Sequence, residues 1–196
     1  MADPLPRQGP LTPLPLDETL RGFACAIVPP MARFILRADD AARAAAGRGL
    51  GLELPSDPCR AATRDGRSAL WLGPDEWLLL AAEADGPAVA AAIADSAAGT
   101  RHALFDVGHR QIGLALSGPL AADVLAQGCP LDLDPSAFPV GMCTRTLLAK
   151  TEIVLWRRDA ERFHVEVARS FARYAGELIV LAARGAAAMA AAAGSR

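Results

Sequence analysis

The feature that most restricts the fold is an order of strands and helices that the chain predicts twice. In the first half we expect strands at 33–37, 69–72, 76–80 and 102–107 and a helix at 87–97. Another helix follows the first strand, with Asp39 or Asp40 as its cap and the glycines at 47, 49 and 51 as its end. The Gly-Pro-Asp turn between the second and third strands favours a hairpin, because proline presets φ. The order is therefore β-α-β-β-α-β.

The second half opens in the same way. A strand at 111–116 precedes a helix for which Ser117 is the expected cap and Gly128 the expected end. Strands at 144–148 and 152–156 then follow as a pair.

The last strand and helix complete the repeat. In this strand Phe163, Val165 and Val167 alternate with His164 and Glu166, and the period of two assigns His164 and Glu166 to the outer face. The helix begins at Ser170 and carries an apolar stripe made of Phe171, Tyr174, Leu178 and Leu181. The two halves together predict an α+β protein built from two ferredoxin-like βαββαβ modules.

The ends of the chain differ from these modules. Seven of the 15 prolines fall in the first 30 residues, so an arm over 1–22 is expected to contain neither helix nor central strand. The modules are expected at 23–108 and 109–184. An Ala-rich tail at 185–196 extends the last helix.

Charge and composition exclude several classes of protein. Twenty Lys and Arg against 22 Asp and Glu give a formal charge of -2, which provides no general attraction to nucleic acid or anionic membranes. The start of the chain lacks a signal peptide pattern, and no run of 18 apolar residues occurs, so a cytoplasmic protein is expected. The four cysteines form no CxxC pair and are expected to be reduced.

Motifs for nucleotides and metals are missing. Lys150-Thr151 lacks the glycines of a phosphate loop, and no G-x-G-x-x-G segment occurs. The three histidines cannot share one helical turn, so no metal site is expected. The most site-like group is Asp106 with His109, because a carboxylate can orient an imidazole for acid-base work. The alternative is a turn in which Asp106 accepts backbone N–H bonds across Gly108.

Four spaced motifs resemble the gamma subunit of heterotetrameric sarcosine oxidase. They are Leu72-Gly73-Pro74-Asp75-Glu76-Trp77-Leu78, Asp106-Val107-Gly108-His109-Arg110, Gly128-Cys129-Pro130-Leu131-Asp132-Leu133 and Arg169-Ser170-Phe171-Ala172. The segment from Phe105 to Gly118 is also similar to the glycine-cleavage T-protein family, with Gly108 where serine is usual. The motifs add Arg110 and Trp77 to Asp106 and His109 as candidate binding residues.

The resemblance implies a T-protein-like, folate-binding fold and a place in a complex. That complex demethylates sarcosine oxidatively to glycine, with tetrahydrofolate as one-carbon acceptor. The implied cofactors FAD, FMN, NAD and tetrahydrofolate lie on partner subunits, and the implied partners are the alpha, beta and delta subunits. Because Cys129 stands where the T-protein family has an acidic residue, the chain is expected to be a non-catalytic accessory subunit.

Two other functions and one contact surface remain open at this stage. The chain could instead be a stand-alone folate-binding or aminomethyltransferase-like protein, or a self-assembling scaffold. The Pro-rich arm over 1–22, or the region of Trp77, is expected to be covered by partners. The alternative is an arm that packs back on its own domain or has no fixed structure.

Overall fold

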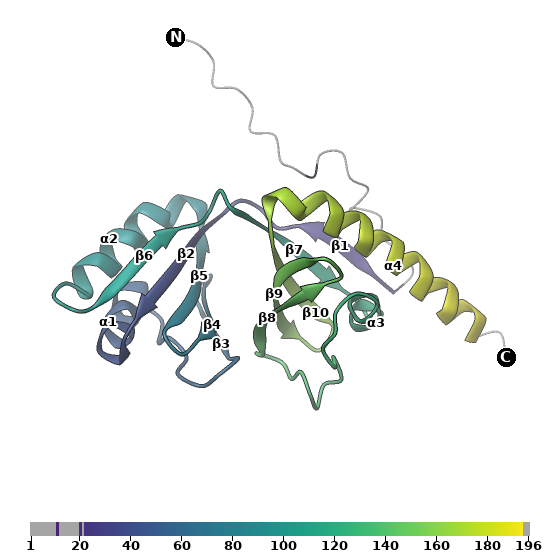
Figure 1. Cartoon of the computed structure of the whole chain (residues 1–196), viewed down its shortest axis with the longest axis horizontal. Coiled ribbons are helices and arrows are strands. Elements are labelled where there is room, and N and C mark those ends of the chain that lie inside the picture. Colours follow the sequence, from purple (N-terminus) through teal and green to yellow (C-terminus); the bar gives the residue numbers. More distant parts are fainter. Residues whose placement is uncertain (1–10, 12–19, 21, 194–196) are drawn as a thin grey trace, which may run out of the picture.

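Two five-stranded antiparallel sheets make up the protein, and one face of each sheet packs against the other. The computed structural model describes Leu11, Leu20 and residues 22–193. Two helices cover the outer face of each sheet, so the chain forms layers in the order helix, sheet, sheet, helix (Figure 1). The predicted α+β class is confirmed.

The first sheet holds a complete ferredoxin-like unit. Its elements are β2 (Met31–Ala38), α1 (Asp40–Leu50), β3 (Ala61–Arg64), β4 (Arg67–Gly73), β5 (Glu76–Ala82), α2 (Gly86–Ser96) and β6 (His102–Asp106). The strand order is β3-β4-β5-β2-β6, in which every pair is antiparallel. The unit β2-α1-β4-β5-α2-β6 is the predicted βαββαβ module, and β3 extends the sheet at one edge.

The second sheet takes its last strand from the start of the chain. Its elements are β1 (Ala24–Ile27), β7 (Gln111–Ser117), α3 (Ala121–Ala126), β8 (Cys143–Leu148), β9 (Thr151–Asp159), β10 (Arg162–Ala168) and α4 (Ala172–Ala193). The order is β1-β7-β10-β9-β8. Strand β1 lies beside β7 in the same way that β6 lies beside β2 in the first sheet. It takes the place of a strand after α4, since no strand follows α4 among the described residues.

The expected module boundaries can be placed on this topology. Position 108 falls in the turn between β6 and β7, whereas β1 lies within 23–108 and pairs with the second sheet. Helix α4 runs through 185 without a break. The division into four segments stays a prediction. Most of the arm over 1–22 lies outside the described residues, and Leu11 is buried in the core of the second sheet.

Local signals for α1 explain its two ends. The Asp39 carboxylate accepts the Ala42 N–H at 2.9 Å, as the predicted cap should. Gly51, with φ of 73°, ends the helix, but Gly47 and Gly49 lie inside it, so the prediction that they stop the helix is wrong. A Cβ at Gly49 would lie 2.4 Å from the Ala92 carbonyl oxygen. This glycine therefore serves the close approach of α2.

Two further details of the prediction are wrong. Ser117 does not cap α3, because the helix begins only at Ala121 and has no side-chain cap. Gly118 lies between them with φ of 107° and turns the chain before the helix starts.

The alternation of the strands reveals a second buried face. On β5, Trp77, Leu79 and Ala81 contact the helices, while Leu78 and Leu80 face the second sheet. The outer face predicted for His164 and Glu166 is this inter-sheet face, where both are buried. Their prediction as exposed residues is wrong because both faces of the sheet are covered.

The apolar stripe predicted for the last helix is also placed differently. The core side of α4 consists mainly of alanines with one isoleucine: Ala172, Ala175, Ile179, Ala182, Ala183 and Ala186. Phe171, Tyr174 and Leu181 are exposed, and Leu178 is half-buried. By length and composition alone, the helix over Arg169–Ala192 could cross a membrane, yet its alanine side lies in the core of this fold.

Candidate functional site

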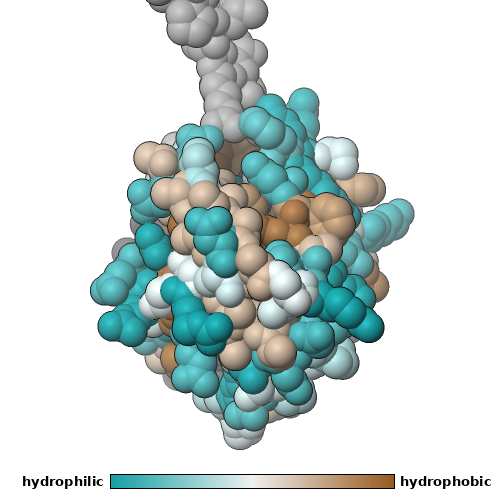
Figure 2. Space-filling view, turned by 90° about the vertical axis from the view of Figure 1, so that its left-hand side faces the viewer, coloured by the Kyte–Doolittle hydropathy of each residue, from teal (hydrophilic) through white to brown (hydrophobic). Residues whose placement is uncertain are grey.

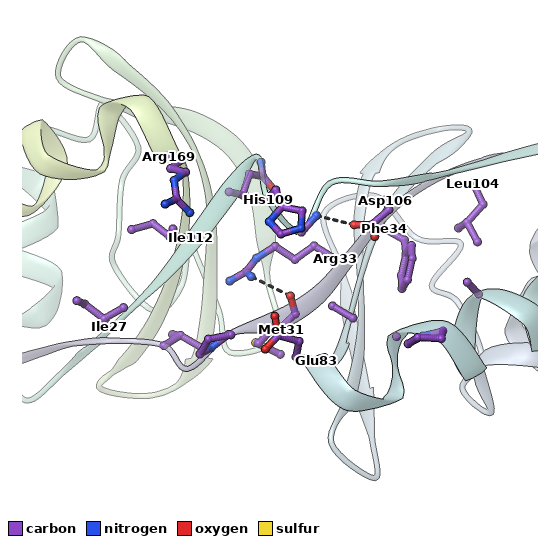
Figure 3. Close-up of a pocket in the computed structure, with 18 of the residues that line it drawn as sticks. Ile27, Met31, Arg33, Phe34, Glu83, Leu104, Asp106, His109, Ile112 and Arg169 are labelled. Carbon is purple, nitrogen blue, oxygen red and sulfur yellow. Dashed lines mark hydrogen bonds between the residues drawn. The ribbon is translucent and has the colours of Figure 1, made fainter. Parts of the chain in front are cut away.

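A cavity of about 570 Å³ lies between the two halves of the protein. The β1–β2 segment, the start of α2 and the β6–β7 turn form its walls (Figure 3). Apolar side chains line most of it: Ile27, Met31, Phe34, Leu104, Ile112 and Leu11. Its volume is in the range of small-molecule pockets, roughly 300–1,000 Å³.

Two of the four candidate residues meet at this cavity. Asp106 and His109 both line it, from the end of β6 and from the turn that follows (Figure 3). The Asp106 carboxylate accepts the Gly108 N–H at 2.8 Å, which is the turn bond expected from the sequence. Asp106 is nevertheless exposed. Asp106 therefore forms the expected turn and also lies at the rim of the cavity.

The other two candidates lie elsewhere. Arg110 borders a separate cavity of about 220 Å³ beside Lys150 and Glu152. Trp77 is 2% exposed in the first core, where its indole N–H donates to the Pro55 carbonyl at 2.8 Å. A partner cannot cover a ring that is already buried. The Trp77 side chain is therefore not part of the contact surface predicted for this region.

Replacing Asp106 by asparagine should have a small thermal effect. The amide oxygen can still accept the Gly108 N–H, so the loss is about 0.5–1 kcal/mol of unfolding free energy and a few degrees in melting temperature. Catalytic constants of an assembled complex should not change. A normal melting temperature together with lost turnover would instead identify Asp106 as a catalytic carboxylate.

Sequence reasoning missed a buried polar cluster between the sheets. Arg33 on β2 donates from Nε to Glu166 Oε2 at 2.7 Å, and His164 Nε2 lies 2.7 Å from Glu166 Oε1. All three residues are at most 3% exposed. Gly113 on β7 leaves the room they need, since a Cβ there would lie 3.1 Å from Glu166 Oε1. The signal was Arg33, a charged residue with apolar neighbours on both sides in strand β2.

The charge state of Glu166 follows from these contacts. Burial raises the pKa of the Glu166 carboxyl, but the hydrogen bonds and charges of His164 and Arg33 outweigh it, and the net pKa is lowered. The carboxylate therefore stays ionised at neutral pH and holds the two sheets together through Arg33.

This lowered pKa predicts a loss of stability in acid. The unfolded chain binds a proton at Glu166 near its ordinary pKa of about 4.3, whereas the folded chain does so only at lower pH. The contribution of Glu166 is therefore complete above about pH 4.5 and is lost as the pH falls below it. Urea unfolding from pH 7 to 3.5 should show the difference between wild type and Glu166→Gln shrinking in acid. A difference that stays constant would contradict the assignment.

A second polar link joins the sheets at the surface. Glu76 on β5 pairs with Arg145 on β8 and with Arg37 on β2. The hydrogen bond from Arg145 lowers the pKa of Glu76, burial opposes this, and the charges of Arg145 and Arg37 lower it further. Both charged links are structural contacts between the halves.

Possible metal ligands are not grouped in the described part of the chain. No group of three or more His, Cys, Asp or Glu within it could hold a metal ion. All four cysteines are free thiols, as expected. Burial raises the pKa of the Cys143 thiol to about 12, so this thiol is a poor nucleophile.

Comparisons with known sequences give one consistent result. A family model described as the sarcosine oxidase, gamma subunit family matches residues 36–184. Sarcosine oxidase subunit gamma from Arthrobacter sp is 36% identical over 126 residues, which cover 64% of this chain and 61% of that protein. The subunit gamma of Corynebacterium sp. (strain P-1) is 36% identical over 110 residues, or 56% of this chain and 53% of that protein. The matches thus span only about half to three fifths of these curated relatives.

Two solved structures extend the comparison to the fold. A chain of heterotetrameric sarcosine oxidase from Corynebacterium sp. U-96, in complex with pyrrole 2-carboxylate, has a TM-score of 0.85 and 28% identity. The match covers 92% of this chain and 96% of that chain. Glycine cleavage system aminomethyltransferase T from Bartonella henselae has a TM-score of 0.62 at 16% identity, covering 83% of this chain and 49% of that one.

The protein is therefore of the T-protein-like class, with two ferredoxin-like modules joined through their sheets. At 16% identity the aminomethyltransferase shows the fold alone. The chain belongs to the sarcosine oxidase gamma subunit family, because the family model matches more than half of it.

Proposed function

We propose that this chain is a non-catalytic accessory subunit of a heterotetrameric sarcosine oxidase. The observation that carries the proposal is the similarity to a chain of such an oxidase over 92% of this chain. The complex would convert sarcosine to glycine in the cytoplasm, with tetrahydrofolate as acceptor of the one-carbon unit. FAD, FMN and NAD would be held by the alpha and beta subunits, with delta as the fourth chain.

The buried cluster supports an accessory role. Both carboxylate oxygens of Glu166 are engaged by Arg33 and His164, so the group is occupied in holding the sheets together. A general base must instead reach the proton that it abstracts.

The test is turnover by the chain with and without its partners. The isolated chain should show no flavin absorbance and no oxidation of sarcosine, whereas co-expression with the alpha, beta and delta subunits should yield an active complex. Turnover by the isolated chain would overturn the proposal.

The cavity favours a second candidate, a folate-binding or aminomethyl-transfer protein. Asp106 and His109 line this largely apolar space. Gln111 lines it as well. Titration of the isolated chain with tetrahydrofolate decides: saturable micromolar binding would favour this candidate.

A further inference from the structure

Two of the four cysteines lie opposite each other where the two halves of the protein meet. Arg60, just before β3, forms an antiparallel bridge with Met142, just before β8. The next pair in this register is Cys59 with Cys143, and the Cys143 N–H donates to the Cys59 carbonyl at 2.9 Å. Strands β3 and β8 are edge strands of the two sheets and face each other in the lower part of Figure 1. The cysteine pair therefore joins one edge of the first sheet to one edge of the second.

The register brings the two cysteines within reach of a disulfide. Directly opposite residues in antiparallel strands have Cα atoms about 4.5–5.5 Å apart, and disulfides join Cα atoms separated by about 4.4–6.8 Å. The Cys143 side chain points across the junction, because its Sγ donates to the Trp71 carbonyl on β4 at 3.6 Å. Burial is the main cause of the raised pKa of the Cys143 thiol, and the negative charge of Cys59 raises this pKa as well. That influence requires the two sulfur atoms to lie near each other.

The two thiols differ in their access to solvent. Cys59 is half-buried, and its neighbours Ser56, Asp57 and Arg60 are exposed. The lower part of the side shown in Figure 2, which belongs to the first half of the protein, is mainly hydrophilic. Cys143 is fully buried among apolar side chains between the sheets. A small oxidant in solution can therefore reach Cys59 directly, whereas Cys143 can react only with a group inside the protein.

The other two cysteines do not share this arrangement. Both are buried in the core of the second sheet. Cys25 on β1 is opposite Leu116 on β7, and Cys129 Sγ lies 3.8 Å from Thr146 Oγ1. An oxidant in solution is therefore expected to act first on the pair at the junction.

We propose that Cys59 and Cys143 form an oxidation-sensitive dithiol, which hydrogen peroxide converts into a disulfide between the two halves. The inference does not depend on the proposed function. In the first step the Cys59 thiolate attacks a peroxide oxygen and the O–O bond breaks, so that Cys59 becomes a sulfenic acid and hydroxide leaves. The hydroxide takes up the proton that the thiol has lost and becomes water.

In the second step the Cys143 sulfur attacks the Cys59 sulfur. The S–S bond forms and the S–O bond breaks, and the departing hydroxide takes the Cys143 proton to give a second water. The two thiols lose two electrons in total and the peroxide gains them. Because a thiolate is the nucleophile, the raised pKa of Cys143 makes this step the slower one. The opposite position of the two residues favours it, since the reaction is intramolecular.

The disulfide should stabilise the protein. Cys59 and Cys143 are about 84 positions apart, so the bond closes a long loop and restricts the unfolded chain. For a chain of this size we expect the melting temperature to rise by roughly 5–15 °C on oxidation. A reducing agent should reverse the rise.

The experiment treats the folded full chain with hydrogen peroxide in mildly alkaline buffer, then denatures it and alkylates the remaining thiols. Wild type should retain two of its four thiols, and its mass before alkylation should fall by the mass of two hydrogen atoms. Digestion should yield one peptide pair linked through Cys59 and Cys143. Cys59→Ser should form no link and show no rise in melting temperature. The matched control, Cys129→Ala, removes a buried thiol outside the pair and should still form the link.

Three results would overturn the inference. Wild type in which Cys59 remains a sulfenic or sulfinic acid, with no link to Cys143, would show that the buried thiol does not reach it. A covalent dimer joined through Cys59 of two chains would assign this thiol to a contact between molecules. A link that forms only in urea would show that the fold keeps the two sulfur atoms apart.

Discussion

Replacing Glu166 by glutamine should lower the melting temperature more than any surface substitution in this protein. The change leaves the buried Arg33 guanidinium without its counter-charge, because the amide that replaces the carboxylate is neutral. Breaking a buried ion pair by removing one partner costs about 3–5 kcal/mol. For a domain of this size that corresponds to roughly 6–20 °C. Thermal unfolding followed by circular dichroism measures the shift.

Two further variants separate the lost charge from other causes. Glu152→Gln changes an exposed glutamate on the neighbouring strand β9 and should alter stability by less than about 0.5 kcal/mol. Combining Arg33→Met with Glu166→Gln removes the unpaired charge, so the double variant should recover about 2 kcal/mol of the loss. A double variant less stable than the sum of both single changes would show that the ion pair is not the origin of the effect.

The sequence predicted those elements whose cause is local. The Gly73-Pro74-Asp75 turn between β4 and β5 needs only the φ preference of proline and the alternation of its flanks. The Asp39 cap of α1 likewise depends on residues within one helical turn. The turn at Asp106 could be predicted because its hydrogen bond to Gly108 joins residues only two positions apart.

Features that depend on distant parts of the chain could not be predicted in this way. The pairing of β1 with β7 joins residues about 90 positions apart, and no local pattern distinguishes it from pairing within the first module. Alternation in β10 correctly separated Val165 from His164 and Glu166, but alternation cannot tell a solvent-facing side from one that a second sheet covers. The resemblance to a known family was needed to connect the repeat with a complex.

Replacing Gly118 by alanine should destabilise the junction between the start of the chain and the second sheet. Gly118 has φ of 107°, which costs an L-residue roughly 1–2 kcal/mol. A Cβ there would also lie 2.4 Å from the Gly22 carbonyl oxygen, which accepts the Leu120 N–H at 3.1 Å. Relieving this contact must displace the backbone that leads into β1. We expect a total loss of about 3–5 kcal/mol in urea unfolding.

A second glycine separates the two contributions. Gly99 also has a positive φ, 77°, but a Cβ there would meet no atom within 4 Å, so Gly99→Ala tests the backbone conformation alone. Its expected cost is about 1–2 kcal/mol, and the remainder of the Gly118→Ala effect measures the contact with Gly22. Equal losses in both variants would show that the approach of the two segments can relax without cost. A larger loss at Gly118 would establish that the stability of the second sheet depends on the close contact between Gly118 and Gly22. This contact holds β1, a strand from the first half of the chain, in place beside β7.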